Sequence, residues 1–290
     1  MSGEARGGGP AAAPEVKAPR RSVLFVPGSS ARMLEKARGL ACDTVVLDLE
    51  DSVAPAAKDA ARDAVCAAVK TYGGREVVVR VNAPDTPWHG EDVSAVRRAA
   101  PDAILLPKTG DAGEITAIRV RTDGVPLWAM IETPMGVLNV AAIAASGVGC
   151  LVMGTNDLLK ALRGQALDDR RNLWFALGRT VTAARAFGLG VIDGTYNDIA
   201  DAAGFAESCA QGRAFGFDGK TLIHPAQIAA CNRIFAPSPE EVAHARAILA
   251  AFARAPGRGA IALNGRMVER LHAEEAARIL ALAAAIESRD

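Results

Sequence analysis

Short apolar runs alternate with Ala-rich helical segments along the chain from residue 22 onward. Each run is rich in Val, Ile and Leu and ends in polar or charged residues. Such runs are typical of parallel strands that are buried on both faces. The predicted strands cover residues 22–26, 44–49, 76–81, 103–106, 126–131, 150–153, a stretch starting at 191–193, and 217–223.

Eight strands that alternate with helices predict an α/β protein with a closed (β/α)₈ TIM barrel, which we place at residues 21–237. An open doubly wound sheet is the alternative, but no GxGxxG motif follows the first run. Charged residues gather where the runs end. Because the carboxyl ends of barrel strands form the functional face, we expect the active site there.

Residues 238–290 are not needed to close a barrel. Ser238, with Glu241 three positions later, is a capping box that begins a helix. A short strand at 260–263 and a last helix at 271–286 follow. We therefore expect a C-terminal helical extension that covers the barrel mouth of its own or a neighbouring subunit.

Composition narrows the classes of function. The chain has 290 residues, a formal net charge of zero and a pI near 6.9, so its charge gives no reason to expect nucleic-acid binding. It lacks an apolar stretch of about 18 residues, so we expect no membrane span. Five scattered cysteines without CxxC spacing suit reduced thiols in the cytoplasm. Residues 1–20 lack the apolar centre of a secretory signal, and we expect a disordered tail.

Two carboxylates follow neighbouring predicted strands. Glu132 lies at the end of the fifth run, and Asp157 lies just beyond the sixth. Adjacent parallel strands are roughly 5 Å apart, so the two carboxylates can share one cation. Carboxylate oxygens suit the hard ions Mg²⁺ and Mn²⁺. The alternative is that each carboxylate caps the helix that follows its strand.

Further charged side chains end the second and third runs. Asp48 and Glu50 are candidates to accept hydrogen bonds from metal-bound water, whereas Asp51 fits equally well as a turn residue. Arg80 emerges from an apolar strand, and its planar donor fork suits a carboxylate or an enolate oxygen. An internal ion pair with Asp48 or Glu50 is the alternative for Arg80, and both can hold.

Two lysines are candidates for Schiff-base chemistry, which needs a desolvated lysine at a strand end. Lys108 and Lys220 lie on the fourth and eighth runs. We favour solvated or phosphate-contacting roles for both. His224, which precedes Pro225, is interpreted as a turn residue.

Motifs at these strand ends resemble those of a known family. They are RSVLFVPG (21–28), DLEDSV (48–53), RVN (80–82), LPK (106–108), IETP (131–134), GTND (154–157), GFDGKTLIHP (216–225) and FAPSPEEVAHAR (235–246). Over essentially residues 20–290 the chain resembles the citrate lyase β-subunit-like family of the acyl-CoA lyase superfamily. That group includes malyl-CoA, β-methylmalyl-CoA and citramalyl-CoA lyases.

The resemblance implies a Mg²⁺-dependent enzyme, with Mn²⁺ as a substitute, that cleaves or forms a malyl-CoA-like 3-hydroxy-3-carboxyacyl thioester by Claisen chemistry. Glu132 and Asp157 would hold the metal. Arg80 would bind the α-keto acid and stabilise the thioester enolate. The substrates would be an acyl-CoA and a small α-keto acid such as glyoxylate, and the protein would be a homotrimer or homohexamer.

The resemblance also implies contacts from Thr155 and Asn156 to the substrate and from Arg32 to the CoA phosphates. One departure concerns the tail, where the lyases carry an aspartate that reaches a neighbouring active site as acid or base. Here the segment GRMVERL (265–271) places Glu269 there, one methylene longer. Similar tails resemble malyl-CoA thioesterases. Hydrolysis of the same esters is therefore one alternative function, and a carrier-dependent citryl lyase subunit is another.

Overall fold

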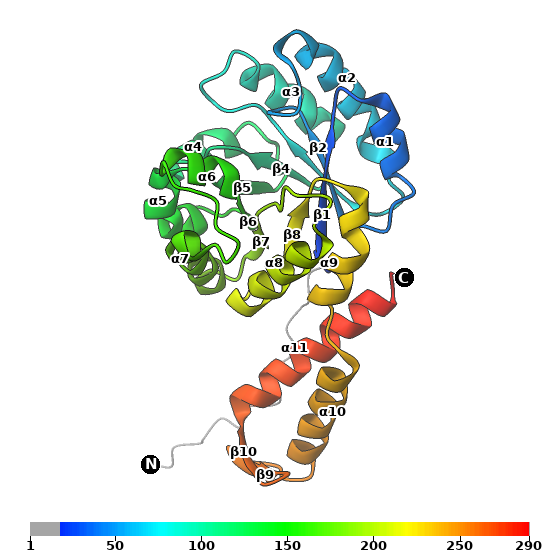
Figure 1. The fold of residues 1–290 in the computed structure, drawn as a ribbon, viewed down its shortest axis with the longest axis vertical. Coiled ribbons are helices and arrows are strands. Elements are labelled where there is room, and N and C mark those ends of the chain that lie inside the picture. The colour runs from blue at the N-terminus through cyan, green and yellow to red at the C-terminus, as the bar shows by residue number, and fades with distance from the viewer. Residues whose placement is uncertain (1–17, 290) are drawn as a thin grey trace, which may run out of the picture. The chain divides into compact units, whose positions relative to one another are not determined.

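The computed structural model describes residues 18–289. A first compact unit, Arg20–Phe235, holds eight parallel strands that pair in sequence order, and β8 pairs with β1 to close the barrel (Figure 1). The predicted TIM barrel is thus confirmed. The strands are β1 Ser22–Pro27, β2 Thr44–Asp48, β3 Glu76–Arg80, β4 Ala103–Leu106, β5 Leu127–Ile131, β6 Cys150–Met153, β7 Gly190–Asp193 and β8 Gly219–Leu222.

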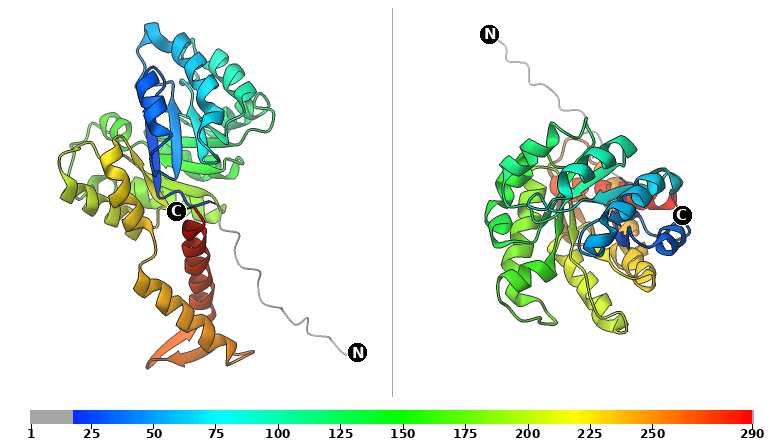
Figure 2. Two further views of the ribbon diagram at one scale, coloured as in Figure 1. Left: turned by 90° about the vertical axis from the view of Figure 1, so that its right-hand side faces the viewer. Right: turned by 90° about the horizontal axis from the view of Figure 1, so that it is seen from above.

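Helices follow the strands and lie outside the ring that the strands form (Figures 1 and 2). The α-helices of this unit are α1 Ala31–Ala37, α2 Lys58–Ala68, α3 His89–Ala99, α4 Ala112–Arg119, α5 Pro134–Ala145, α6 Thr155–Ala161, α7 Trp174–Ala186, α8 Ala202–Phe215 and α9 Ile228–Phe235. Four 3₁₀ turns are η1 Pro55–Ala57, η2 Val69–Thr71, η3 Arg171–Leu173 and η4 Pro225–Gln227.

Alternation along the strands divides the apolar residues into two layers. Val45 and Leu47 of β2 belong to a cluster that also contains helical residues such as Val65, so they face outward. Val46 belongs to a second cluster, with Trp128, that contains only strand residues and therefore fills the barrel interior. Since side chains repeat every two residues, the next inward positions toward the barrel mouth are fixed by the same pattern.

Those next inward positions carry the chemistry. Two residues after the interior residues Val23, Val46, Val78 and Trp128 stand Phe25 on β1, Asp48 on β2, Arg80 on β3 and Met130 on β5. Asp48 and Arg80 are also direct neighbours in the register of β2 and β3. The strands thus bring a carboxylate, a guanidinium cation, an aromatic ring and a thioether together at the same level of the barrel interior.

A second compact unit is formed by the chain from Ala236 onward, with Pro19. It consists of α10 Pro239–Ala253, a hairpin of β9 Ala260–Leu263 and β10 Arg266–Glu269, and α11 Arg270–Glu287. The hairpin turns at Asn264 and Gly265, whose φ angles of +50° and +75° are those of a type I′ turn. Ala245, Ile248, Val268 and Ala276 form its small apolar core.

The predicted elements of the C-terminal extension are largely present. The capping box is confirmed, because Ser238 Oγ accepts from the amide of Glu241 and the Glu241 carboxylate accepts from the amide of Ser238. The short strand at 260–263 is present, but its partner β10 was not predicted. None of the described helices is long and apolar enough to cross a membrane.

The N-terminal tail was expected to reach residue 20. Arg20, however, is bound into the barrel unit, since its guanidinium pairs with Glu76 at 2.6 Å and lies over the ring of Trp128. The barrel unit therefore begins at Arg20. The remaining expectation, disorder of the N-terminal tail, falls mainly on residues 1–17, outside the described residues.

Candidate functional site

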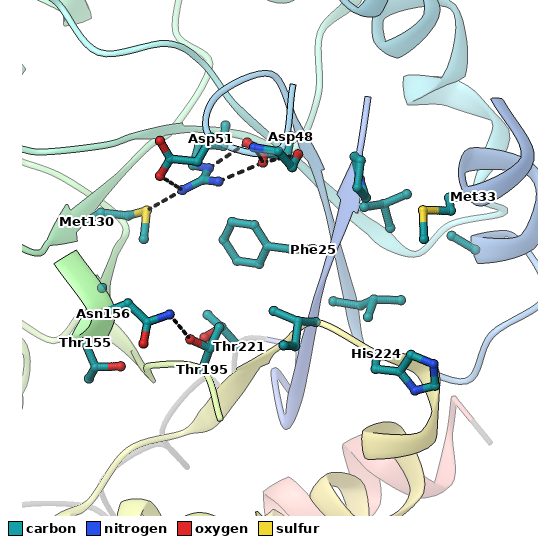
Figure 3. A pocket seen from close by; sticks show the side chains of 18 of the residues that line it. Phe25, Met33, Asp48, Asp51, Met130, Thr155, Asn156, Thr195, Thr221 and His224 are labelled. Atoms are coloured by element: carbon teal, nitrogen blue, oxygen red, sulfur yellow. Dashed lines mark hydrogen bonds and ion pairs between the residues drawn. The ribbon is translucent and has the colours of Figure 1, made fainter. Parts of the chain in front are cut away.

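A cavity of about 560 Å³ opens at the carboxyl ends of the strands. Its polar wall includes Asp48, Arg80, Glu132 and Asp157, and an apolar wall is formed in part by Phe25, Met130 and Met153. Figure 3 shows Asp48, Phe25 and Met130 among the lining residues. The four polar residues come from β2, β3, the end of β5 and the first turn of α6. The barrel thus places the predicted site residues around one hollow, on the face where we expected the active site.

Glu132 follows β5 and is only 3% exposed. Its Oε1 accepts a hydrogen bond from the amide of Lys108 at 2.6 Å, whereas Oε2 has no hydrogen-bond or ion-pair partner in the described chain. Burial, helped by the negative charges of Glu50 and Asp157, raises the pKa of the Glu132 carboxyl to about 7, although Arg80 and the Lys108 amide oppose the shift. A buried carboxylate with a free oxygen beside a second carboxylate is the electrostatic setting of a cation site.

The helix-cap alternative for these carboxylates is wrong. Thr133, not Glu132, caps α5, since its Oγ1 accepts from the amide of Gly136 at 2.9 Å. Asp157 lies in the first turn of α6, yet it forms no hydrogen bond or ion pair among the described residues. Both carboxylates are therefore free to face a ligand in the cavity.

The donor set fits a magnesium ion. Among the described residues, no group of three or more His, Cys, Asp or Glu side chains can hold a metal. The cavity offers two carboxylates, Glu132 and Asp157, as metal ligands. Mg²⁺ is usually held by one or two carboxylates, with water and substrate oxygens completing its octahedron. The unpartnered Oε2 of Glu132 is the oxygen that such an ion would use.

Arg80 is held by a bidentate ion pair. Its Nε and Nη2 each donate to one oxygen of Asp48 at 2.7 Å, and its Cζ lies over the Phe25 ring, 5.0 Å from the ring centroid. Burial alone would raise the pKa of the Asp48 carboxyl, but the charge and hydrogen bonds of Arg80 outweigh it and hold that pKa below its ordinary value. The internal ion pair expected as an alternative for Arg80 is therefore confirmed. Nε and Nη2 are committed to Asp48, whereas Nη1 lies 2.8 Å from Glu50 Oε2 and donates to the Met130 sulfur at 3.8 Å.

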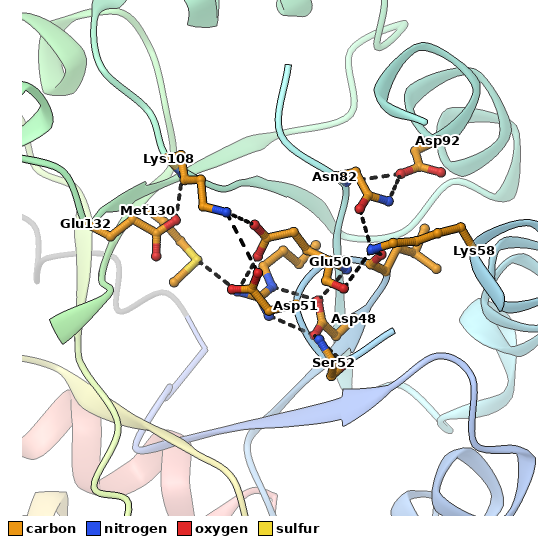
Figure 4. A network of polar contacts seen from close by, with 12 residues as sticks. Asp48, Glu50, Asp51, Ser52, Lys58, Asn82, Asp92, Lys108, Met130 and Glu132 are labelled. Atoms are coloured by element: carbon orange, nitrogen blue, oxygen red, sulfur yellow. Dashed lines mark hydrogen bonds and ion pairs between the residues drawn. The ribbon is translucent and has the colours of Figure 1, made fainter. Parts of the chain in front are cut away.

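Glu50 lies between the cations Arg80 and Lys108, and Figure 4 shows its contact with Lys108. Its Oε1 accepts from Lys108 Nζ at 2.7 Å, and its Oε2 lies 2.8 Å from Arg80 Nη1. The second contact is close but misaligned, because Oε2 is buried without a hydrogen bond. Burial raises the pKa of the Glu50 carboxyl above its ordinary value, and the positive charges of Arg80 and Lys108 offset only part of this effect.

Lys58 was not identified from the sequence. Its buried Nζ donates to the carbonyls of Leu49 and Glu50, both at 2.8 Å, and to Asn82 Oδ1 at 2.6 Å (Figure 4). Asn82 is in turn held by Asp92. A cation that binds two successive carbonyls fixes the backbone that carries Asp48 and Glu50. These contacts join positions that are far apart along the chain, so no local sequence pattern announces them.

The interpretation of Lys220 as a solvated or phosphate-contacting residue is wrong. Lys220 is fully buried, and its Nζ donates to Asp193 Oδ2 at 2.7 Å. Asp193 also pairs with Arg170 at 2.8 Å. Lys108 is 42% exposed at its side chain but is engaged with Glu50. Neither lysine lines the cavity, so neither is placed for a Schiff base.

Of the three residues predicted to contact the substrate, two line the cavity and one does not. Thr155 and Asn156 line the cavity, and Asn156 donates to Thr195 (Figure 3) and to Asn197. Arg32 is exposed on α1 and does not line the cavity, whereas Lys36, one turn further, does. His224 is confirmed as a turn residue, since its Nδ1 accepts from the amide of Ala226.

Glu269 belongs to the second unit. It is the N-cap residue of α11, in a capping-box arrangement with His272, and its amide donates to His272 Nδ1 at 3.0 Å. The carboxylate is half-buried. Its local partners are those of a helix cap, and its catalytic role stays a prediction.

Comparison with known proteins agrees with this geometry. The family model described as HpcH/HpaI aldolase/citrate lyase matches residues 21–225, and one described as C-C bond lyase of the TIM-barrel fold matches residues 178–286. The first match ends where the barrel strands end, and the second continues into α11. Together they cover the barrel and its extension.

Individual relatives are similar over nearly the whole chain. A (3S)-malyl-CoA thioesterase of Cereibacter sphaeroides is 47% identical, over 92% of this chain and 96% of that protein. The citrate lyase subunit beta of Escherichia coli is 37% identical, over 86% of this chain and 88% of that protein. The structure of protein CitE from Mycobacterium tuberculosis in complex with magnesium, acetoacetate and coenzyme A has a TM-score of 0.79 and 33% identity, and covers 92% of this chain and 98% of that one. The chain belongs to the HpcH/HpaI aldolase/citrate lyase family.

Proposed function

We propose that the protein is a Mg²⁺-dependent acyl-CoA lyase that cleaves or forms the carbon–carbon bond of a malyl-CoA-like thioester. The observation that carries the proposal is the cavity at the barrel mouth, where the unpartnered Glu132 Oε2 and Asp157 stand beside the buried Arg80. The solved relative with magnesium and coenzyme A supports both the ion and the class of substrate.

Different residues of the site would bind the metal and the substrate. Glu132 and Asp157 would hold the metal, with Mn²⁺ as a substitute. Asp48, which lines the cavity, would accept a hydrogen bond from one of its water ligands, whereas Glu50, predicted for the same role, does not line the cavity and would act through Arg80. When bound, Mg²⁺ supplies Lewis acidity to the oxygens of the substrate. Arg80, whose orientation is fixed by Asp48, would donate from Nη1 to the carboxylate of the α-keto acid and to the developing enolate oxygen.

Substrate contacts complete the site. Thr155 and Asn156 stand at the amino end of α6 on the cavity wall and would contact the small acid. We keep Arg32 as a candidate for the CoA phosphates and add Lys36, which lines the same cavity. The extension Ala236 onward would cover the barrel mouth of a neighbouring subunit in a homotrimer or homohexamer and bring Glu269 there as acid or base. Free cysteines in the described chain support a cytoplasmic protein.

A second function is favoured by one observation. The relative that is 47% identical is named a (3S)-malyl-CoA thioesterase, so hydrolysis of the same ester is the competing outcome. In that case the site would direct water to the thioester carbonyl in place of breaking the carbon–carbon bond. The similarity to citrate lyase subunit beta raises a third outcome, action only on a carrier-bound acyl group.

One incubation separates the three. With (3S)-malyl-CoA as substrate, a lyase yields glyoxylate, which phenylhydrazine detects, and acetyl-CoA without a free thiol. A thioesterase yields malate and a free CoA thiol, which a disulfide reagent detects. Robust turnover of the free ester by the isolated chain removes the carrier-dependent role, and absence of both products contradicts the first two.

The residue assignment has its own control. Glu132→Ala and Asp157→Ala should abolish the Mg²⁺-dependent reaction while circular dichroism shows a folded barrel. Glu207→Ala removes a carboxylate that is exposed on α8, away from the cavity, and should leave activity unchanged. Full activity in EDTA would contradict the metal assignment.

A further inference from the structure

The guanidinium of Arg80 is incompletely satisfied on the side that faces the cavity. Nε and Nη2 are committed to Asp48, but the aligned acceptor of Nη1 in the described chain is the Met130 sulfur, at 3.8 Å (Figure 4). A thioether is a weak acceptor. Nη1 therefore carries a strong donor that is held by a weak partner, and an anionic oxygen would bind there in its place.

The nearest anion has not taken that position. Glu50 Oε2 lies 2.8 Å from Nη1, yet it makes no hydrogen bond, while Glu50 Oε1 is aligned on Lys108 Nζ at 2.7 Å. A buried carboxylate oxygen without a hydrogen bond is unfavourable, so Glu50 would rotate onto Nη1 if nothing held it. Lys108 is the group that holds it.

Lys108 is well fixed for this task. Its backbone adopts a left-handed conformation with φ of +52°, which is uncommon for a residue with a side chain. In this conformation the amide binds Glu132 and the side chain binds Glu50. Neither Lys108 nor Glu50 lines the cavity, so both act on a ligand there through Arg80.

We propose that Lys108 is a positioning residue: it holds Glu50 so that Oε2, although 2.8 Å from Arg80 Nη1, is not aligned with an N–H, and this leaves that N–H for the carboxylate of the α-keto acid substrate. This inference rests on the proposed function, because it assigns the anion that the reaction requires to one nitrogen of Arg80. Glu50 then acts as a competing counter-ion, and Lys108 sets how strongly it competes.

A double-mutant cycle tests the proposal. Pyruvate, a stable α-keto acid, is titrated calorimetrically into the native protein, Lys108→Met, Glu50→Gln and the double variant, all with Mg²⁺ present. Lys108→Met keeps the amide that binds Glu132 and removes only the ammonium. It should weaken pyruvate binding about tenfold, because Glu50 is released onto Nη1, and Lys108→Arg should restore the affinity.

The Glu50→Gln background decides the mechanism. With the Glu50 carboxylate gone, the carboxylate that remains near Nη1 is the exposed Asp51, whose Oδ2 lies 3.8 Å away, beyond hydrogen-bond distance. Lys108→Met should therefore change pyruvate affinity less than about twofold there. Equal weakening in both backgrounds would mean that Lys108 acts on the anion without Glu50, and that result would overturn the proposal. So would unaltered affinity in Lys108→Met, or no pyruvate binding by the native protein.

Turnover gives a second readout that a merely structural role would not move. In the condensation direction, Lys108→Met should raise the KM for glyoxylate and leave the KM for acetyl-CoA near its native value. The pyruvate titration needs no turnover. A protein that proves not to be a lyase would therefore refute the proposed function without deciding the role of Lys108.

Discussion

Glu132 and Gly154 touch across the ends of β5 and β6. The register pairs Met130 with Val152 and Ile131 with Met153, so the next pair is Glu132 with Gly154. A Cβ on Gly154 would fall 2.2 Å from Glu132 Oε2, far inside contact distance. Only glycine leaves room at this position for the carboxylate oxygen that has no protein partner.

The first prediction concerns this contact. Gly154→Ala should displace the Glu132 carboxylate and weaken Mg²⁺ binding by an order of magnitude or more, because geometry around Mg²⁺ is strict. Calorimetric titration of Mg²⁺ or Mn²⁺ measures the effect. Gly178→Ala is the matched control, since no atom beyond its own helix backbone lies within 4 Å of the methyl that alanine would add on α7. It should bind the ion normally and gain about 0.5–1 kcal/mol of stability. Normal ion binding by Gly154→Ala would show that Glu132 Oε2 is not a ligand.

The second prediction concerns protons released on metal binding. The pKa of Glu132 is raised to about 7, so near neutral pH a fraction of the protein carries a proton on the carboxyl that the ion needs. Affinity for Mg²⁺ should rise with pH up to about 7 and level off above it. Titrations in buffers of different ionisation enthalpy should show proton release at pH 6 and almost none at pH 8. Release that does not depend on pH would contradict the assignment.

The fold could be predicted from the sequence because the patterns that indicate its strands are local. Eight apolar runs with polar ends each fall within a few residues of an observed strand, and the closure of the barrel follows from their number. The strand β10 was missed although its signal was present. Asn264-Gly265 between alternating apolar residues is a strong short-range hairpin signal.

The site was accessible only in part. Alternation in β8 shows why Lys220 is not at the barrel mouth: Leu222 packs in the outer layer, so Lys220, two residues earlier, also points outward. On α1 and the turn that follows it, the residues that line the cavity are Met33, Lys36, Ala37 and Leu40, and their i, i+3, i+4, i+7 spacing could have indicated this face in place of Arg32.

Other features depend on side-chain rotation and have no sequence signal. The sequence allowed Arg80 to pair with Asp48, with Glu50 or with a substrate, but not which nitrogen each would use. The structure commits Nε and Nη2 to Asp48 and leaves Nη1 without an aligned carboxylate. The role of Lys108 depends on the same detail, because it is defined by which oxygen of Glu50 is held.

The third prediction concerns the buried pair that the sequence did not reveal. Lys220→Met should destabilise the fold by about 3 kcal/mol, because it leaves the fully buried Asp193 with Arg170 as its remaining cation. Denaturant unfolding measures the change. Arg278→Gln breaks an exposed pair with Glu275 on α11 and should cost at most about 1 kcal/mol. Lys220 should also resist borohydride trapping with pyruvate, and labelling of Lys220 would restore the Schiff-base interpretation.

The fourth prediction concerns the bidentate pair of Arg80. Arg80→Lys keeps the charge but cannot donate to both oxygens of Asp48 and also present a third N–H to the cavity. Turnover should fall at least about a hundredfold, while Mg²⁺ binding by Glu132 and Asp157 persists. Ion titration and steady-state kinetics on the same preparation separate the two effects. Loss of ion binding together with turnover would instead make Arg80 part of the cation site.

The last prediction joins stability to function through Glu132. The carboxyl has a pKa of about 7 in the fold against an ordinary 4.5, so between these pH values the folded state holds a proton that the unfolded chain has lost. Stability contributed by this group is therefore present at low pH and lost as pH rises through 7, by about 3 kcal/mol in total. At pH 8 in EDTA, Glu132→Gln avoids this cost and should unfold at a higher temperature than the native protein.

Added Mg²⁺ should reverse that order. The ion stabilises the ionised carboxylate of the native protein, whereas the amide of Glu132→Gln binds it poorly, so only the native protein should gain thermal stability. Glu207→Gln, an exposed change on α8, should follow the native protein under both conditions. If Glu132→Gln were less stable than the native protein in EDTA at pH 8, Glu132 would be serving the fold, and the metal would have to be sought elsewhere.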